Sequence, residues 1–349
     1  MKIDLIGYIG LFVASLIIAV TSTPLFRSLA VKRKILDTPN SERKIQRTAV
    51  PYLGGFGIAL AVVATTLIAI TISDASAENY LLALSVLAPA IVLGLIGFID
   101  DKKHLTPLSR FIAQTFAGIF TALVLILTKT VGNPTNYLVL DVLLTIVWVV
   151  GICNAINFFD NMDGAAGGIS ALAGFGFAII GLQNGQYFVA AFGLVLSGAC
   201  IGFLFWNWNP AKIYMGDAGA LFIGIILAAL AVRVDPVSVN GATAFFVPIC
   251  VLALPILDTT TVVIDRMRRK VSPFEGGLDH ISHRLIRKGL SIRQAVTTLY
   301  LLEGISIAIG VLINMGGTRY DSFLLIIEIS LIFALLIWFL IIPHEDSRK

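Results

Sequence analysis

The chain has 349 residues, of which 57% are hydrophobic and only 13% are charged. Soluble domains carry about 25% charged residues, so this composition excludes a water-solvated globule and indicates a protein dissolved in a lipid bilayer. The net charge of +4 favours anionic headgroups and phosphates as neighbours, and it gives no reason to expect a nucleic-acid partner.

Apolar stretches of about twenty residues recur along the whole chain, and each is long enough to cross roughly 30 Å of hydrocarbon as a helix. Their continuous apolar character excludes barrel strands, which would alternate apolar and polar residues. The sequence therefore predicts an all-α polytopic membrane protein with about eleven transmembrane helices. The predicted spans are 4–24, 52–72, 81–99, 109–128, 138–157, 166–183, 187–206, 217–233, 242–264, 295–314 and 322–342.

The basic residues predict the orientation of these spans. With the amino terminus outside, 21 of the 25 Lys and Arg fall in inside segments. Because cytoplasmic loops carry the excess of Lys and Arg, we expect an outside amino terminus and a cytoplasmic carboxyl terminus.

The polar chemistry is concentrated in the predicted cytoplasmic segments. The simplest organisation is one transmembrane domain, residues 1–349, with site loops at 25–51, 100–109, 158–165, 207–217 and 265–294. This segregation argues against a transporter, whose ionisable groups would lie near the middle of the bilayer. Glu303 and Glu328 are the clearest charges within spans, and packing between helices or lining a small polar cleft is the simpler interpretation of them.

The third span ends in two adjacent carboxylates, Asp100 and Asp101. They are as compatible with solvated charges at the membrane surface as with a site for magnesium or phosphate. Arg110 and Gln114 begin the next helix one turn apart, so both can face the same site.

The fifth span runs into a polar series with a spacing of three: Asn154, Asn157, Asp160 and Asp163. A helical continuation would align these four side chains on one face. Such groups are costly at a membrane boundary unless they are paired or bind an ion, which favours function over packing. Oxygen ligands suit a hard cation such as Mg²⁺ better than zinc.

Two further segments add phosphate-binding chemistry. Asp217 lies between Gly216 and Gly219 at the start of the eighth span, where backbone N–H groups can approach a phosphate while the carboxylate binds its metal. In the longest inside loop, residues 265–294, His280, His283 and Arg284 offer donors for phosphate or sugar oxygens. Together these loops are typical of magnesium-assisted phosphoryl transfer.

The order of these motifs resembles the polyprenyl-phosphate N-acetylhexosamine-1-phosphate transferases, within glycosyltransferase family 4. The resemblance spans most of the chain. It rests on DTPNSERK and VPYLGG within 37–55, IDDKKHLTPLSRFIAQ at 99–114, NAINFFDNMDG at 154–164, WNPAKIYMGDAG at 208–219, PILDTTTVVIDRMRR at 255–269 and DHISHRLIRKGLSIRQ at 279–294.

This resemblance implies transfer of an N-acetylhexosamine 1-phosphate, with N-acetylglucosamine preferred, from a UDP-sugar to undecaprenyl phosphate with release of UMP. It implies a need for Mg²⁺, with Mn²⁺ as a substitute, a bacterial cytoplasmic membrane, and a role in starting teichoic acid, O-antigen or capsule. The oligomeric state stays open, a homodimer included.

The resemblance also assigns roles to residues. Asp217 and Asn157 are implied as metal ligands, and Asp100, Asp101, Asp160 and Asp163 as the catalytic set, the first two on the lipid-phosphate side and the last two on the nucleotide side. The implied substrate-binding residues are Arg110, Asn154, Lys44, His280, His283 and Arg284.

Four positions depart from the family pattern. Gln46 stands where His is frequent, Asn161 where Gly is usual, Ala220 where Ser is usual, and Ser282 interrupts a His-x-His-His string. A CDP-alcohol phosphotransferase is a weaker alternative, because its two further aspartates are missing after Asp163-Gly164. A transporter or binding protein for lipid-linked sugars is the alternative outside the enzymes.

Overall fold

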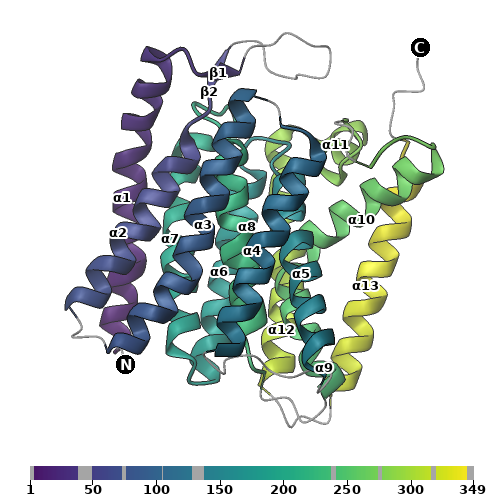
Figure 1. The fold of residues 1–349 in the computed structure, drawn as a ribbon. Coiled ribbons are helices and arrows are strands. Elements are labelled where there is room, and N and C mark those ends of the chain that lie inside the picture. The colour runs from purple at the N-terminus through teal and green to yellow at the C-terminus, as the bar shows by residue number, and fades with distance from the viewer. Residues whose placement is uncertain are drawn as a thin grey trace.

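The computed structural model describes residues 4–37, 49–72, 76–103, 105–127, 137–236, 241–273, 277–315 and 320–343. Within them the chain is a bundle of helices with one very short hairpin, which confirms the all-α prediction (Figure 1). The helices are α1 (Leu5–Lys32), α2 (Gly54–Ile72), α3 (Ala77–Lys103), α4 (Pro107–Leu127), α5 (Leu138–Phe159), α6 (Ala165–Gln183), α7 (Tyr187–Asn207), α8 (Gly216–Arg233), α9 (Gly241–Val251), α10 (Ala253–Arg268), α11 (Ile281–Arg287), α12 (Ile292–Asn314) and α13 (Asp321–Ile341).

Ten helices in the described ranges are long and apolar enough to cross a membrane, and the bent pair α9 and α10 brings the number of spans to eleven. The predicted continuous span 242–264 is wrong in one respect: it breaks at Leu252, and its two halves meet at 82°. Proline explains the break, because Pro255 has no N–H to donate and its ring disfavours a helical continuation from the preceding turn.

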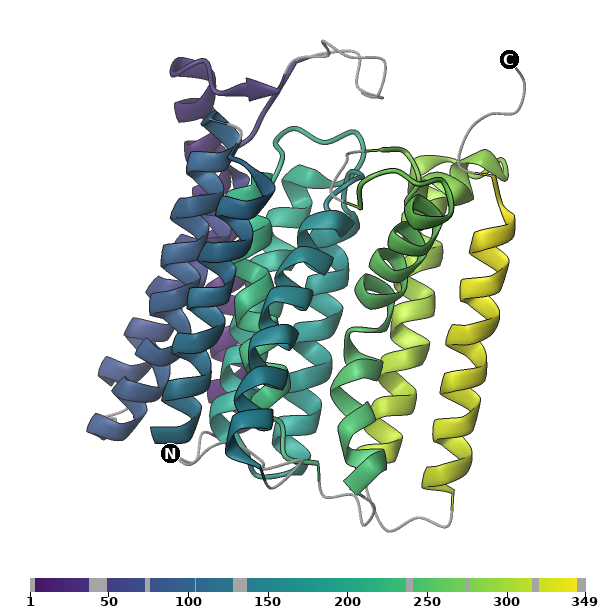
Figure 2. The same ribbon diagram turned by 45° about the vertical axis from the view of Figure 1, so that its right-hand side comes forward.

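The centre of the bundle is α8, which packs against α3, α5 and α2. Most of its residues are buried, whereas α13 stands at the edge with large apolar side chains such as Phe323 and Phe333 exposed (Figure 2). Exposed apolar faces of this kind suit contact with lipid, because every backbone group is already satisfied within the helix.

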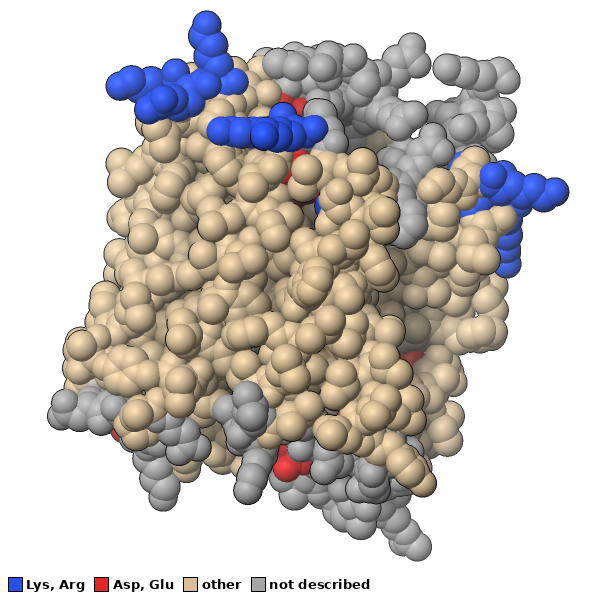
Figure 3. All heavy atoms as spheres, viewed as in Figure 1, with Lys and Arg blue, Asp and Glu red and all other residues tan. Residues whose placement is uncertain are grey.

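One end of the bundle carries the polar segments. The hairpin of β1 (Leu36–Asp37) and β2 (Val50–Pro51), the short helix α11 and the last turn of α10 all lie at this end, and α1 begins at the other (Figures 1 and 2). The blue Lys and Arg side chains visible in Figure 3 gather at the same end. The start of α1 and the end of α13 lie at opposite ends of the bundle, as an odd number of spans requires.

Candidate active site

The polar end of α3 reaches α8 because a glycine lets the two helices approach closely. A Cβ at Gly97 would lie 2.4 Å from the carbonyl oxygen of Asp217, so a side chain there would force the helices apart. One turn later α3 carries Asp100 and Asp101, which therefore lie beside the first residues of α8. Two motifs separated by more than a hundred residues thus meet at one point.

Asp101 caps the start of α8. Its Oδ1 accepts the N–H of Asp217 at 3.0 Å and its Oδ2 accepts the N–H of Ala218 at 3.3 Å. Gly216 precedes them with a φ of +73°, a left-handed conformation that glycine adopts without strain. The free N–H groups and the positive end of the α8 dipole thus hold a carboxylate from another helix.

Asp217 is fixed by two further elements. Its Oδ1 accepts a hydrogen bond from Asn157 Nδ2 of α5 at 2.7 Å, and its Oδ2 lies 3.8 Å from Arg110 Nη1 of α4. The same Arg110 nitrogen lies 3.2 Å from Asp100 Oδ2, while Asp100 Oδ1 accepts the N–H of Leu105 at 2.6 Å. One arginine therefore joins the carboxylates of two helices.

The polar series at the end of α5 only partly forms the predicted helical face. Asn157 lies on the helix, and Asn154 donates to Gln114 Oε1 of α4 and to the Val150 carbonyl. The helix ends at Phe159, so the continuation that would align all four side chains does not form, and Asp160 and Asp163 lie in the predicted 158–165 loop. The turn that follows carries these two residues and leads to Gly164, whose φ of +81° starts α6.

Asp160 and Asp163 differ in their surroundings. Burial, together with the nearby charges of Asp217, Asp101 and Asp163, raises the pKa of Asp160 to about 8. Asp163 Oδ2 instead accepts hydrogen bonds from Asn209 Nδ2 at 2.8 Å and from the N–H of Ala211 at 2.9 Å. Asp163 thereby ties the 158–165 loop to the 207–217 loop.

We call Asp100, Asp101, Asp160, Asp163 and Asp217 the acidic cluster. Within the described part of the chain, the cation that forms ion pairs with it is Arg110. Asp100 Oδ2 is buried and receives no hydrogen bond apart from this ion pair. The carboxyl groups of the cluster outnumber the cations that pair with them, and an added cation would stabilise their ionised form.

A second polar group lies where the 265–294 segment folds back on α10. His280 Nδ1 lies 2.7 Å from Asp258 Oδ2, and Asp258 Oδ1 accepts the N–H of Ile281 at 2.8 Å, so one carboxylate orients the start of α11. Burial, together with the nearby charges of His280 and Arg287, lowers the pKa of His283 to about 4. His283 is therefore neutral at pH 7.

Arg284 is enclosed completely. Its Nη2 lies 3.0 Å from Asp265, its Nε donates to the Asp279 carbonyl, and its Nη1 donates to the carbonyls of Phe339 and Ile342 at the end of α13. These partners join α10, α11 and α13. They give Arg284 a structural task, and its predicted contact with substrate stays a prediction.

The two polar groups touch at the α5 turn. Ser282 Oγ donates to Asn161 Oδ1 at 2.5 Å, and the Phe158 ring meets the His280 ring edge-on with centroids 6.1 Å apart. His280 and His283 therefore stand next to the loop that carries Asp160. Lys44, the remaining predicted site residue, lies outside the described residues.

Comparison with known proteins agrees with this arrangement. A model of glycosyl transferase family 4 matches residues 83–235. The "Probable undecaprenyl-phosphate N-acetylglucosaminyl 1-phosphate transferase" of Bacillus subtilis (strain 168) is 32% identical over 338 residues, covering 93% of this chain and 90% of the relative. The chain belongs to glycosyl transferase family 4.

Other relatives fall in two groups of this family. The "Decaprenyl-phosphate N-acetylglucosaminephosphotransferase" of Mycolicibacterium smegmatis is 31% identical and covers 86% of this chain and 80% of its own length. The "Phospho-N-acetylmuramoyl-pentapeptide-transferase" of Staphylococcus carnosus is 32% identical over 64% of this chain and 74% of its own length. The resemblance inferred from the motifs is thus confirmed.

The residues matched to family 4, 83–235, contain the whole acidic cluster together with Asn157 and Arg110. They do not include α10 and α11. Asp258, Asp265 and Asp279 were not singled out from the sequence, although they organise this second group. The available signal was the seven-residue spacing of Asp258 and Asp265, which places two carboxylates on one face of a helix.

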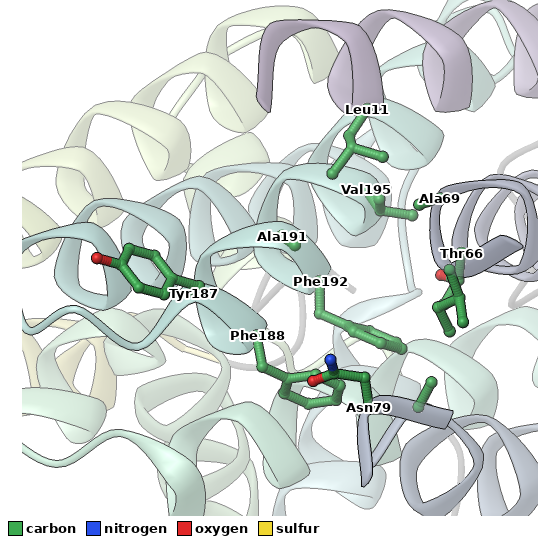
Figure 4. Close-up of a pocket in the computed structure, with 11 residues that line it drawn as sticks. Leu11, Thr66, Ala69, Asn79, Tyr187, Phe188, Ala191, Phe192 and Val195 are labelled. Atoms are coloured by element: carbon green, nitrogen blue, oxygen red, sulfur yellow. The ribbon is translucent and has the colours of Figure 1, made fainter. Parts of the chain in front are cut away.

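A small apolar cavity of about 80 Å³ lies away from this site. Figure 4 shows its lining, which comes from α1, α2, α3 and α7 and includes Leu11, Thr66, Asn79 and Phe192. None of the acidic cluster lines it, so the candidate site of this family 4 protein is the polar end of the bundle.

Proposed function

We propose that the protein transfers N-acetylglucosamine 1-phosphate from UDP-N-acetylglucosamine to undecaprenyl phosphate. An oxygen of the lipid phosphate forms a bond to the sugar-bearing phosphorus, the bond from that phosphorus to the bridging oxygen breaks, and UMP leaves. The observation that carries this proposal is the convergence of the acidic cluster on the start of α8, in a chain related over most of its length to transferases with such names.

The site residues suit this reaction because its main demand is charge control. A phosphate monoester is already largely dianionic at neutral pH, so attack needs alignment and neutralisation more than a strong base. Arg110 reaches toward both Asp100 and Asp217 and is 30% exposed, which leaves part of its guanidinium for a phosphate oxygen. His280 and His283 offer ring nitrogens next to the Asp160 loop.

We propose Mg²⁺ as the cofactor, held by Asp217 with the amide oxygen of Asn157. Among the residues that the structure describes, no three His, Cys, Asp or Glu side chains are grouped closely enough to make a metal site by themselves. The surplus negative charge of the acidic cluster and its oxygen donors suit a hard cation that keeps waters and shares substrate phosphates. Such an ion would neutralise the charge of the diphosphate.

We further propose that the site faces the cytoplasm. The gathering of Lys and Arg at the polar end supports this orientation, since cytoplasmic segments carry the basic excess (Figure 3). A UDP-sugar would then meet the lipid phosphate at the membrane surface, and the product would start a lipid-linked cell-surface glycan such as teichoic acid, O-antigen or capsule.

The test is a transfer assay with purified protein, undecaprenyl phosphate, Mg²⁺ and radiolabelled UDP-N-acetylglucosamine, following label into the lipid phase. Asp217→Asn removes the charge at the start of α8, and Asp235→Asn, an exposed position beyond the other end of the same helix, is its control. Magnesium-dependent labelling that D217N loses and D235N keeps supports the proposal. Absence of label with every UDP-N-acetylhexosamine would leave a binding or transport role instead.

A further inference from the structure

The break between α9 and α10 exposes backbone groups in the middle of a membrane span. The two half-helices meet at 82° around Leu252, so the first N–H groups of α10 have no partners within a continuous helix. An unpaired N–H in hydrocarbon is strongly unfavourable, because no water is present to accept its hydrogen bond. The bend therefore needs an acceptor from another helix.

Glu303 of α12 supplies that acceptor. Its Oε2 accepts the N–H of Leu254, the second residue of α10, at 2.9 Å, and the side chain is fully buried. An acidic group at this point also faces the positive end of the α10 dipole. Glu303 thus acts as a cap supplied by a neighbouring helix, which explains an acidic residue in the middle of an apolar span.

The half-helix capped in this way, α10, supplies side chains that hold residues 279–284, which we call the histidine segment. Asp258, one turn beyond Leu254, holds His280 and the Ile281 N–H, and the far end of α10 supplies Asp265 and Arg266. All of these bonds reach the segment 279–284. The direction of α10 after the break therefore sets where this segment lies.

The same segment closes on the α5 turn through the bond from Ser282 to Asn161. A continuous series of contacts therefore runs from Glu303 through α10 to His280 and then to the loop of Asp160. We propose that Glu303 is a positioning residue for the transfer reaction: by fixing the bend of α10, it holds the segment with His280 and His283 against the α5 turn that leads to Asp160. The effect of Glu303 on catalysis rests on the proposed function, whereas its effect on the position of residues 279–284 does not.

Glu328 of α13 provides a matched control. It also carries a carboxyl group buried within a span, and it is 4% exposed. In the described part of the chain it receives no backbone N–H. Loss of Glu328 removes a buried charge without removing the cap.

The experiment compares Glu303→Gln, Glu303→Met and Glu328→Met in two assays. The first measures KM and kcat for the UDP-sugar. The second introduces Asn161→Cys with Ser282→Cys into each background and measures the rate of disulfide formation, which reports how closely the 279–284 segment stays against the α5 turn. This second assay needs no activity.

E303Q keeps an oxygen acceptor, so its KM and crosslinking rate should stay within about threefold of the parent chain. E303M loses the acceptor, and we expect at least a tenfold fall in kcat/KM, mainly through KM, with a clearly slower crosslink. E328M should resemble the parent chain in both assays. If E303M does not assemble, Glu303→Asp, which is one methylene shorter, gives the same comparison.

Equal behaviour of E303M and E328M, or an E303Q chain as slow to crosslink as E303M, would overturn the assignment. If E303M slows the crosslink relative to the parent chain but the parent chain itself transfers no sugar, only the proposed function is contradicted. The two failures are therefore distinguishable.

Discussion

Replacing Arg266 by Met should destabilise the protein by leaving a buried carboxylate short of its main partner. Arg266 Nε and Nη2 lie 2.8 and 2.7 Å from the two oxygens of Asp279, and both side chains are at most 5% exposed. Removing one member of a buried ion pair costs about 3–5 kcal/mol. Arg269, 2.8 Å from Asp279 but 28% exposed, would keep part of this, so we expect a loss of roughly 2–4 kcal/mol.

The assay is thermal unfolding in detergent, in which we expect R266M to lower Tm by roughly 4–8 °C. The double variant R266M/D279N removes both charges and should recover part of that loss, because no unpaired carboxylate stays buried. If D279N lowers the stability of R266M by as much as it lowers the stability of the parent chain, the two side chains act independently, and the reasoning is refuted.

The same pair predicts a pH dependence. Burial by itself raises the pKa of Asp279, but the hydrogen bonds and charge of Arg266 outweigh it and lower that pKa to about 2. Because the folded-state pKa lies below the ordinary value, the pair stabilises the fold fully above about pH 4 and loses this contribution as the pH falls toward 2. The stability of R266M should change less over this interval.

Three further outcomes are expected. D217N should reduce transfer by at least about a hundredfold with little change in Tm, and a large fall in Tm would mark the residue as structural. S282A and N161A should each raise KM for the UDP-sugar several-fold. The two effects should not add in the double variant, because both substitutions remove the same hydrogen bond. Additive effects in a double-variant cycle would contradict this. The pKa of His283 is lowered to about 4, so as the pH falls the unfolded chain binds a proton at this residue before the folded chain does. The free energy of unfolding should therefore fall by roughly 3 kcal/mol between pH 6.5 and pH 4. Unfolding measured against pH should show that H283Q removes this dependence.

The sequence was sufficient to predict the membrane spans, because a long apolar run directly indicates a helix that is surrounded by hydrocarbon. It failed at Leu252, where apolar residues continue without interruption and only Pro248 and Pro255 mark the break. A window of hydropathy averages over such a point. The direction of a half-helix after a break depends on what caps it, and here the cap is Glu303, about fifty residues away.

The sequence predicted which residues make up the site better than it predicted the hydrogen bonds between them. Spacing and glycines singled out the residues of the acidic cluster, and the structure brings two of them, Asp101 and Asp217, into contact. That Asp101 caps α8, and that Asp163 binds the 207–217 loop, could not be derived, because each bond joins residues far apart in the chain. A motif states which groups are present, whereas helix packing decides which atoms of those groups remain available.

This distinction separates the two polar groups of the molecule. The acidic cluster is carried by α3, by the turn that follows α5 and by α8. A glycine contact and the Asp101 cap fix how α3 approaches α8, so the geometry there has little freedom. The histidine segment, residues 279–284, depends on a bent half-helix. In the described part of the chain it meets the α5 turn through the hydrogen bond from Ser282 to Asn161 and the ring contact of His280 with Phe158. Asn161 and Ser282 are two positions at which the sequence departs from the pattern it resembles. Changes in reaction chemistry should therefore follow substitutions in the first group, while changes in sugar preference at constant chemistry should follow substitutions at this joint. Pairing N161G with S282H, the residues usual in the family, tests that division: we expect the order of preference among UDP-sugars to change with the magnesium requirement intact, and an unchanged order would place sugar selection elsewhere.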